Sequence, residues 1–255
     1  MEVKFVYTVS DRGDMIRDVL RSIKSLRRFA DREEIVVFYT PPRSQSSLEE
    51  LSKLAEVKLV PNVTEPFVFR KERGPGRYGE KVHLCDVDCE NVVFLDADTV
   101  VRKDIRELLQ GDYDFSSRIG EAYYEKDFDM KIWREMFARY GAEPIPMPNA
   151  GFMIFKNWCH RDIKDLWLKF LREPLPHPYK YYHKDQYSLA LALSLTGKRI
   201  RWMTEKEHSF RWMDEPEDAY VVHGEPPRVK TNIIPVGLRR KIPLKIRKKI
   251  LDLIG

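Results

Sequence analysis

The 255-residue sequence contains no run of about twenty consecutive apolar residues, so it predicts no helix that could cross a membrane. It also lacks the basic start and apolar core of a signal peptide. The three cysteines, Cys85, Cys89 and Cys159, cannot all pair, and no second cluster completes a zinc site. We therefore expect a cytoplasmic protein whose cysteines are reduced, structural thiols.

A strong excess of charge of one sign is absent as well. The 45 Lys and Arg residues against 40 Asp and Glu give a net charge of +5, and the two signs are mixed through most of the chain. A nucleic-acid-binding surface would be more clustered, so no nucleic-acid partner is expected. With 43% hydrophobic and 33% charged residues, the chain is long enough for one large globular domain or two small ones.

The most informative stretch is Asn91–Val101, in which an apolar run leads into Asp96-Ala97-Asp98. A short apolar run of this kind predicts a buried, parallel strand. Side-chain direction in a strand repeats every two residues, so Asp96 and Asp98 can point the same way. Two carboxylates that close repel each other, and a divalent cation carrying a diphosphate would relieve the repulsion. The alternative is a solvated turn or a helix cap formed by Asp98.

The first sixty residues predict a β-α-β-α-β order, with strands at 3–9, 35–39 and 57–60. Ser47-Leu48-Glu49-Glu50 has the form of a capping box at the start of the second helix. This order implies a parallel sheet, whose ligands bind at the carboxyl ends of the strands. Residues 8–11 end the first strand, so we expect them to face the same crevice as Asp96 and Asp98.

Other polar residues stand beside predicted strands and helices. Lys81 begins a helix predicted to run to Cys89 and to lead into the motif strand. Asn149-Ala150-Gly151 precedes a buried strand, which suggests close backbone approach to something bound. Asp185-Gln186 opens an apolar helix, where Asp185 could also be an ordinary N-terminal carboxylate. These three places are therefore candidate binding positions.

A late strand, predicted over 219–222, ends in His223-Gly224. His223 is the one histidine of six that stands at a strand end and is followed by glycine. Neutral imidazole is a common metal ligand, so His223 is our candidate ligand, with a structural histidine as the alternative.

The ordered set of Thr8-Val9-Ser10-Asp11, Lys81, Leu-Asp-Ala-Asp-Thr, Asn-Ala-Gly-Phe, Asp-Gln and Val-His-Gly resembles the glycogenin-like glycosyltransferases of GT-A type. The resemblance covers about residues 3–230. It implies an α/β fold of the nucleotide-diphospho-sugar transferase type, a single Rossmann-like, mostly parallel sheet flanked by helices. The domain would span residues 1–235, followed by a C-terminal tail over 236–255.

The resemblance also implies roles for individual residues. Asp96, Asp98 and His223 would hold Mn²⁺ or Mg²⁺. The other expected donor-binding residues are Thr8, Ser10, Asp11, Lys81, Ala97, Gly151, Gly224 and Arg228, of which the first three would border the nucleotide base. Asn149, Asp185 and Gln186 would lie around the transferred sugar as catalytic residues. In the family a lysine of the late motif binds phosphate, and here Arg228 and Lys230 both remain open as its counterpart.

The function implied is metal-dependent transfer of a sugar from a nucleotide-diphosphate sugar, a UDP-sugar, with retention at the anomeric carbon and to an acceptor that the sequence does not identify. An inverting enzyme would instead need a carboxylate base directed at the acceptor. Two other classes remain open. A sugar-1-phosphate nucleotidyltransferase would usually carry a Gly-rich loop after the first strand, where residues 10–13 hold one glycine. The other is a non-catalytic sugar-nucleotide binding module.

The C-terminal tail predicts a basic amphipathic helix that starts at Pro243. Ile246, Ile250, Leu253 and Ile254 share one face, and lysines occupy the opposite side. Such a helix can lie in an anionic membrane interface, which would place the protein peripherally at the inner membrane face. Packing of the apolar face on the catalytic domain is an equal alternative.

Overall fold

The structure is a computed structural model, and it describes residues 2–64, 69–70, 74–75, 78–124, 128–173, 184–211 and 218–224. The helices are α1 (Met15–Leu26), α2 (Gln45–Ser52), α3 (Met130–Ala138), α4 (Cys159–Asp162), α5 (Lys164–Arg172) and α6 (Lys184–Leu195), with 3₁₀ helices η1 (Arg32–Glu34), η2 (Tyr78–Asp86), η3 (Ile105–Leu109) and η4 (Glu121–Tyr124). The strands are β1 (Lys4–Val9), β2 (Ile35–Tyr39), β3 (Glu56–Leu59), β4 (Phe69–Arg70), β5 (Gly74–Pro75), β6 (Val92–Leu95), β7 (Thr99–Val101), β8 (Phe115–Ile119), β9 (Pro148–Phe155), β10 (Ile200–Trp202), β11 (His208–Phe210) and β12 (Val221–His223).

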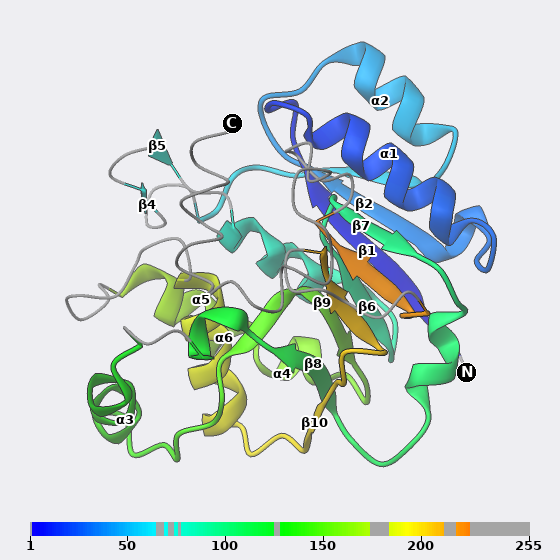
Figure 1. Ribbon diagram of the computed structural model, residues 1–255. Helices are drawn as coiled ribbons and strands as arrows, with labels where there is room; N and C mark the ends of the chain where they lie inside the picture. Colours follow the sequence, from blue (N-terminus) through cyan, green and yellow to red (C-terminus); the bar gives the residue numbers. More distant parts are fainter. Residues whose placement is uncertain are drawn as a thin grey trace, which may run out of the picture.

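A seven-stranded sheet in the order β10-β8-β9-β6-β1-β2-β3 forms the centre of the molecule (Figure 1). The neighbours β6, β1, β2 and β3 are parallel, as the β-α-β-α-β pattern predicts. Strand β9 runs antiparallel to both of its neighbours. The sheet is therefore mostly parallel and flanked by helices, which confirms the predicted α/β fold class.

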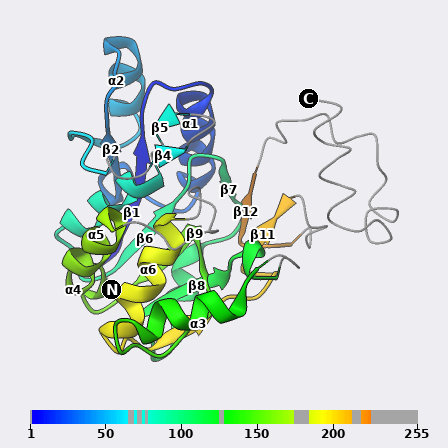
Figure 2. The ribbon, with the colours of Figure 1, turned by 90° about the vertical axis from the view of Figure 1, so that its left-hand side faces the viewer.

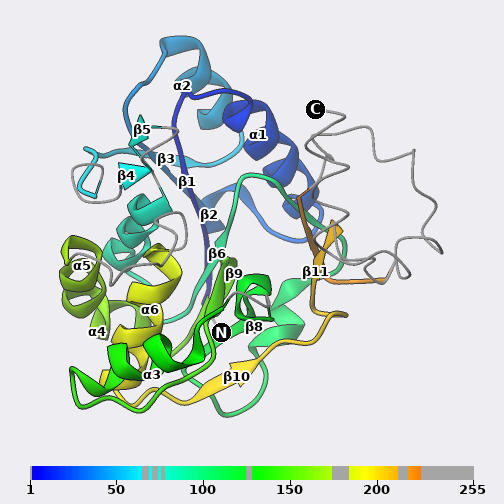
Figure 3. The same cartoon turned by 60° about the vertical axis from the view of Figure 1, so that its left-hand side comes forward.

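The two faces of this sheet are both apolar, and each is covered by different elements. On β1, Val6 packs with the cluster that contains Trp133 and Trp167, from α3 and α5. The alternate residues Phe5 and Tyr7 pack on the other face, with apolar residues of α1 and α2. Figures 2 and 3 show α4, α5 and α6 on one side of the sheet and β11 on the other. Burial on both faces is what continuous apolar strands predict.

The stretch 91–101 is divided between two sheets. Strand β6 is fully buried and lies between β1 and β9. After Asp96–Asp98 the chain leaves the main sheet, and β7 becomes the outer strand of a small sheet ordered β11-β12-β7. β12 runs antiparallel to β7, and His223 lies opposite Thr99. The aspartate motif is therefore the connection between the main sheet and the small sheet.

Two helix predictions are corrected. Helix α2 begins at Gln45 and is capped by Ser44, whose Oγ accepts a hydrogen bond from Ser47 N at 3.2 Å, so the predicted capping box at Ser47 is wrong. The helix predicted over 81–89 is instead the 3₁₀ helix η2. A 3₁₀ helix aligns residues three apart, and His83 Nε2 accordingly lies 3.4 Å from Glu80 Oε2.

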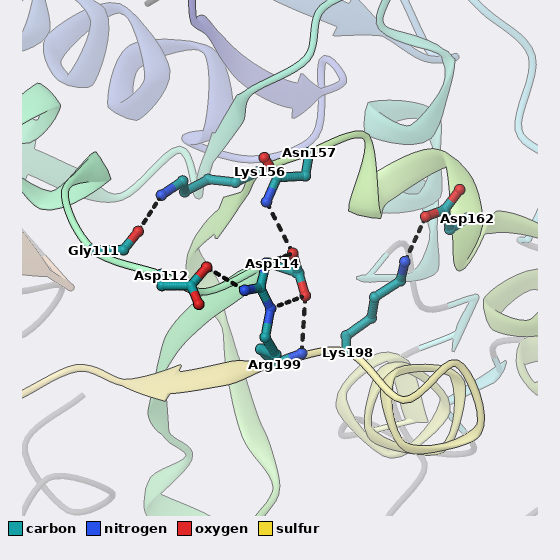
Figure 4. Close-up of polar contacts among 8 residues, drawn as sticks. All are labelled: Gly111, Asp112, Asp114, Lys156, Asn157, Asp162, Lys198 and Arg199. Carbon is teal, nitrogen blue, oxygen red and sulfur yellow. Dashed lines mark hydrogen bonds and ion pairs between the residues drawn. The ribbon is translucent and has the colours of Figure 1, made fainter.

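An ion-pair network holds β10, the edge strand of the main sheet, in place (Figure 4). The Arg199 side chain donates to both carboxylate oxygens of Asp114, at 3.0 and 2.8 Å, and also bonds Asp112. Asn157 donates to Asp114 as well. These bonds outweigh partial burial and hold the pKa of Asp114 below its usual value. Together they fasten the segment before β10 to the segment before β8.

The cysteines, the expected absence of a membrane-spanning helix and the C-terminal tail were also subjects of prediction. Cys85, Cys89 and Cys159 are all free and buried, and burial raises the pKa of the Cys159 thiol to about 12. Within the described ranges, no helix has the length and apolar character needed to cross a membrane. The predicted tail helix, Arg228 and Lys230 lie outside the described residues.

Glu80 gives a prediction for stability. Its buried carboxylate accepts hydrogen bonds from Val63 N and Thr64 N at 2.9 and 2.7 Å. Burial would raise the pKa of Glu80, but these bonds and His83 outweigh it and lower the pKa below 4.5. Glu80→Gln should lower the free energy of unfolding at pH 7 by about 1–3 kcal/mol, because hydrogen bonds to a charged acceptor are lost.

A depressed pKa contributes stability above the unfolded value, and this contribution is lost as pH falls through the folded value. The difference between wild type and Glu80→Gln should therefore shrink below about pH 4.5, as measured by urea unfolding. The control is Glu33→Gln, at an exposed carboxylate. If the difference in unfolding free energy between wild type and Glu80→Gln stays the same as pH falls, this account is contradicted.

Candidate active site

Three predicted metal ligands come together where the two sheets meet. His223 Nε2 lies 3.3 Å from Asp98 Oδ1 and 3.6 Å from Asp96 Oδ2, and one possible ligand atom from each residue falls within 4.8 Å of the others. The aspartate side chains are 24% and 23% exposed and that of His223 is 11% exposed, so solvent reaches all three. Carboxylate oxygens with an imidazole nitrogen suit Mn²⁺ or another divalent cation, so the residues present fit a metal ion.

Gly151 makes room for His223. A Cβ atom on Gly151 would lie 2.1 Å from His223 Cε1 and 2.5 Å from Nδ1, which is closer than atoms can approach. The sequence predicted close backbone approach to something bound at this glycine, whereas in the structure it is the imidazole ring of His223 that lies there. Gly151 is also fixed by its backbone, because its N–H donates to Asn149 Oδ1 and its carbonyl accepts from Asp96 N, both at 2.8 Å.

Gly224 joins the end of β12 to the aspartate motif. Its φ of +86° is in the left-handed region that favours glycine, and its N–H donates to Asp98 O at 2.9 Å. Asp96 O accepts from both the N–H and the hydroxyl of Thr99, at 3.2 and 2.8 Å. The backbone around the motif is therefore held from both sides.

Lys81 is a buried cation between two acidic residues. Its Nζ lies 3.0 Å from both carboxylate oxygens of Asp96, 2.9 Å from Ala150 O and 3.6 Å from Asp185 Oδ2. Burial would lower the pKa of Lys81, but the charges of Asp96 and Asp185 outweigh it and raise the pKa. The ammonium group is therefore charged and fixes the orientation of Asp96.

Asp185 and Gln186 stand in the first turn of α6. The Asp185 carboxyl is 2% exposed, and burial raises its pKa by more than Lys81 lowers it. Asp185 Oδ1 and Gln186 Oε1 have no hydrogen-bond partner within the described part of the chain. Buried acceptors without partners are costly, so these two oxygens are well suited to accept from hydroxyl groups of a ligand. Asp185 is thus both an N-terminal helix carboxylate and part of the charged cluster.

Glu121 belongs to the same cluster and is absent from the sequence-based predictions. Its Oε2 accepts from Asn149 Nδ2 at 3.2 Å. Burial would lower the pKa of His223, but Asp98, Asp96 and Glu121 outweigh it and raise the pKa. The available signal is a polar residue close to a strand end, because Glu121 is the second residue after β8 and Asp96 is the first after β6.

The predicted base-binding residues lie at the carboxyl end of β1 with other partners. Asp11 accepts from the Tyr39 hydroxyl at 2.6 Å and donates through its N–H to Pro42 O. Ser10 is buried, and its N–H contacts Met15 Sδ. Thr8 Oγ1 has no partner in the described ranges. These contacts place the residues beside the motif strand, and none of them reaches Asp96 or Asp98.

Comparison with known proteins adds independent evidence. The model of "Glycosyl transferase family 8" matches residues 81–208, which is half of the chain. This range holds Lys81, Asp96, Asp98, Asn149 and Asp185, whereas His223 lies beyond it. A search of curated protein sequences found no match.

Several solved glycosyltransferases have the same fold. An active-site mutant of LgtC is 14% identical with a TM-score of 0.62, covering 96% of this chain and 99% of that one. Mouse xyloside xylosyltransferase 1 is 13% identical with a TM-score of 0.54, covering 89% and 99%. GlyE of Streptococcus pneumoniae is 11% identical with a TM-score of 0.58, covering 99% and 64%. The fold is of GT-A type, and the chain belongs to glycosyl transferase family 8.

Proposed function

We propose that this glycosyltransferase uses a divalent cation to transfer a sugar from a nucleotide-diphosphate sugar, a UDP-sugar, with retention at the anomeric carbon. The observation that carries the proposal is the Asp96–Asp98–His223 cluster, with the buried Lys81 and Asp185 directly beside it. Retention and the choice of donor rest on the glycogenin-like family. LgtC, a galactosyltransferase of this fold, is known in complex with donor and acceptor sugar analogs.

Asp96, Asp98 and His223 would hold the cation, Mn²⁺ in the first instance, and the cation would act as Lewis acid while the nucleoside diphosphate leaves. The chain itself prepares this site. Lys81 holds the Asp96 carboxylate in one orientation through bonds to both oxygens. Gly224 holds the backbone of Asp98. Pre-organised ligands of this kind need little rearrangement when the cation binds.

The sugar would lie against the acceptor groups of α6 and β9. Transfer of a glycosyl group passes through a transition state with positive charge on the sugar ring. Asp185 supplies a buried carboxylate and Gln186 a buried amide oxygen, each with capacity to accept from sugar hydroxyls. Asn149 is held by Glu121 on one side and by Gly151 N on the other. These residues would orient the sugar and stabilise its developing charge.

Metal dependence gives the first test of this function. With Mn²⁺ and a panel of sugar nucleotides, Asp98→Asn should lower release of nucleoside diphosphate by about a hundredfold, because a charged ligand of the Lewis acid is lost. The exposed Asp88, changed to Asn, serves as the matched control and should retain activity. Turnover that survives both Asp98→Asn and a chelator would show that the metal assignment is wrong.

The close approach at Gly151 gives a second test. Gly151→Ala should weaken Mn²⁺ binding by about tenfold or more, because the new Cβ would displace the His223 ring. Gly120→Ala is the matched comparison, since its Cβ would lie 2.9 Å from Gln186 Oε1 instead. It should slow sugar transfer while Mn²⁺ affinity, measured by calorimetry, stays unchanged. Equal Mn²⁺ affinity in wild type and Gly151→Ala would argue against His223 as a ligand.

A third test separates the sugar from the diphosphate. Asp185→Asn and Asn149→Ala should lower the rate of transfer by more than they lower UDP affinity in the presence of Mn²⁺, because both residues would face the sugar. Transfer is followed by product formation, and UDP affinity by calorimetry. If the two quantities fall together, these residues support the metal site or the fold and do not contact the sugar.

A further inference from the structure

The end of α1 and the residues after it carry a polar stripe that is bonded to β7. The stripe consists of Ser22, Ser25 and Arg28, which are spaced three residues apart and so share one face. Ser25 Oγ accepts from Val101 N at 2.9 Å, and Arg28 Nη2 donates to Val101 O at 2.6 Å. Since β7 is the outer strand of the small sheet, these side chains occupy the edge at which a further strand would pair.

The third residue of the stripe, Ser22, belongs to a row of buried hydroxyl groups that ends at the aspartate motif. Tyr7 Oη lies 3.0 Å from Ser22 Oγ, Ser22 Oγ lies 2.9 Å from Thr99 Oγ1, and Thr99 Oγ1 donates to Asp96 O at 2.8 Å. Tyr7, Ser22 and Thr99 are fully buried. Each of these hydroxyls has one proton, and the carbonyl can only accept.

The direction of every hydrogen bond in this row follows from those proton counts. Thr99 directs its proton at Asp96 O, so it must accept from Ser22, and Ser22 must in turn accept from Tyr7. Burial raises the pKa of Tyr7, which keeps its hydroxyl neutral and able to donate. The row is therefore a one-way series of donors from β1 to the backbone of the motif.

The row of hydroxyl groups links β1 to the aspartate motif beyond the point where the backbone pairing of β1 with β6 ends. Register pairs between β1 and β6 run from Lys4↔Val92 to Val6↔Phe94 and end before Asp96. Beyond that point, Tyr7 reaches the motif through side chains. The other support comes from β9, through Gly151 O and Asp96 N.

We infer that Tyr7, Ser22 and Thr99 are positioning residues that set the affinity of the metal site. They hold the Asp96–Asp98 turn, while Ser25 and Arg28 tie Val101 of β7 to the α1 segment, and β7 pairs on its other edge with β12, which carries His223. The inference rests on the proposed function, because it takes Asp96, Asp98 and His223 as the metal ligands. Hydroxyls that only stabilised the fold would affect unfolding and leave metal affinity unchanged, so the two roles can be separated.

The test measures binding of Mn²⁺ alone, from the paramagnetic resonance signal of free Mn²⁺, on full-length variants whose thermal unfolding is recorded in parallel. Thr99→Val keeps the shape of the side chain and removes the hydroxyl, and it should raise the Kd for Mn²⁺ by about tenfold. Thr99→Ser restores the hydroxyl and should return the Kd to within about twofold of wild type. The control is Ser116→Ala, which removes a buried hydroxyl bonded to Arg201 O in the main sheet. It should lower the unfolding temperature without changing the Kd.

Because the hydroxyl groups of Tyr7, Ser22 and Thr99 are bonded in series, the inference can also be tested with a double variant. Tyr7→Phe and Ser22→Ala interrupt the same row, so their combined effect on the Kd should be smaller than the product of the separate effects. If Thr99→Val binds Mn²⁺ like wild type while Asp98→Asn does not, the positioning role is wrong and the metal site stands. If Asp98→Asn also binds like wild type, the metal site itself is wrong and the inference falls with it.

Discussion

The charge balance around Lys81 is the interaction on which the site depends. Its ammonium group is buried with Asp185 and lies against the partly exposed Asp96, and a charge on either of the two buried groups would be costly without a partner. Removing one partner of such a buried pair typically costs about 3–5 kcal/mol, because the other charge is left uncompensated. Lys81 stands in η2, Asp96 after β6 and Asp185 in α6, so one charged group ties together segments from three parts of the chain. The orientation of the Asp96 carboxylate follows from this arrangement.

Much of the site was predictable because its residues stand where strands and helices begin or end. An apolar run that leads into Asp96 and Asp98 marks the end of a buried strand, and His223 with its following glycine marks another. The rule that parallel strands end at one edge of a sheet does not explain why these two ends meet, because β6 and β12 belong to different sheets. It was the family resemblance that predicted Asp96, Asp98 and His223 as one cluster. Gly151 was predictable as a place of close approach, although the sequence did not show that His223 is the group that approaches.

Other features left no local signal. Ser22 and Thr99 are separated by 77 positions in the chain, and a single hydroxyl contact produces no periodic pattern. The division of 91–101 between two sheets depends on β12, which returns from the far end of the described chain to pair with β7. Glu121 had a weak local signal in its place after β8, but its contact with Asn149 joins residues 28 positions apart and is visible only in the structure. The motifs alone left three functions open: a glycosyltransferase, a nucleotidyltransferase and a binding module. Membership of glycosyl transferase family 8 favours the first of these.

The division of the metal ligands between two sheets has a consequence for how the molecule holds together. Asp96 and Asp98 follow a strand of the main sheet, whereas His223 ends a strand of the small sheet. A cation that bound all three would form a reversible cross-link between segments far apart in the chain. Such a cross-link reduces the conformational freedom of the unfolded chain. Because such a cation binds the folded chain in preference to the unfolded one, its concentration would govern how firmly the small sheet stays attached. Loading with metal would then tighten the architecture as well as prepare the chemistry.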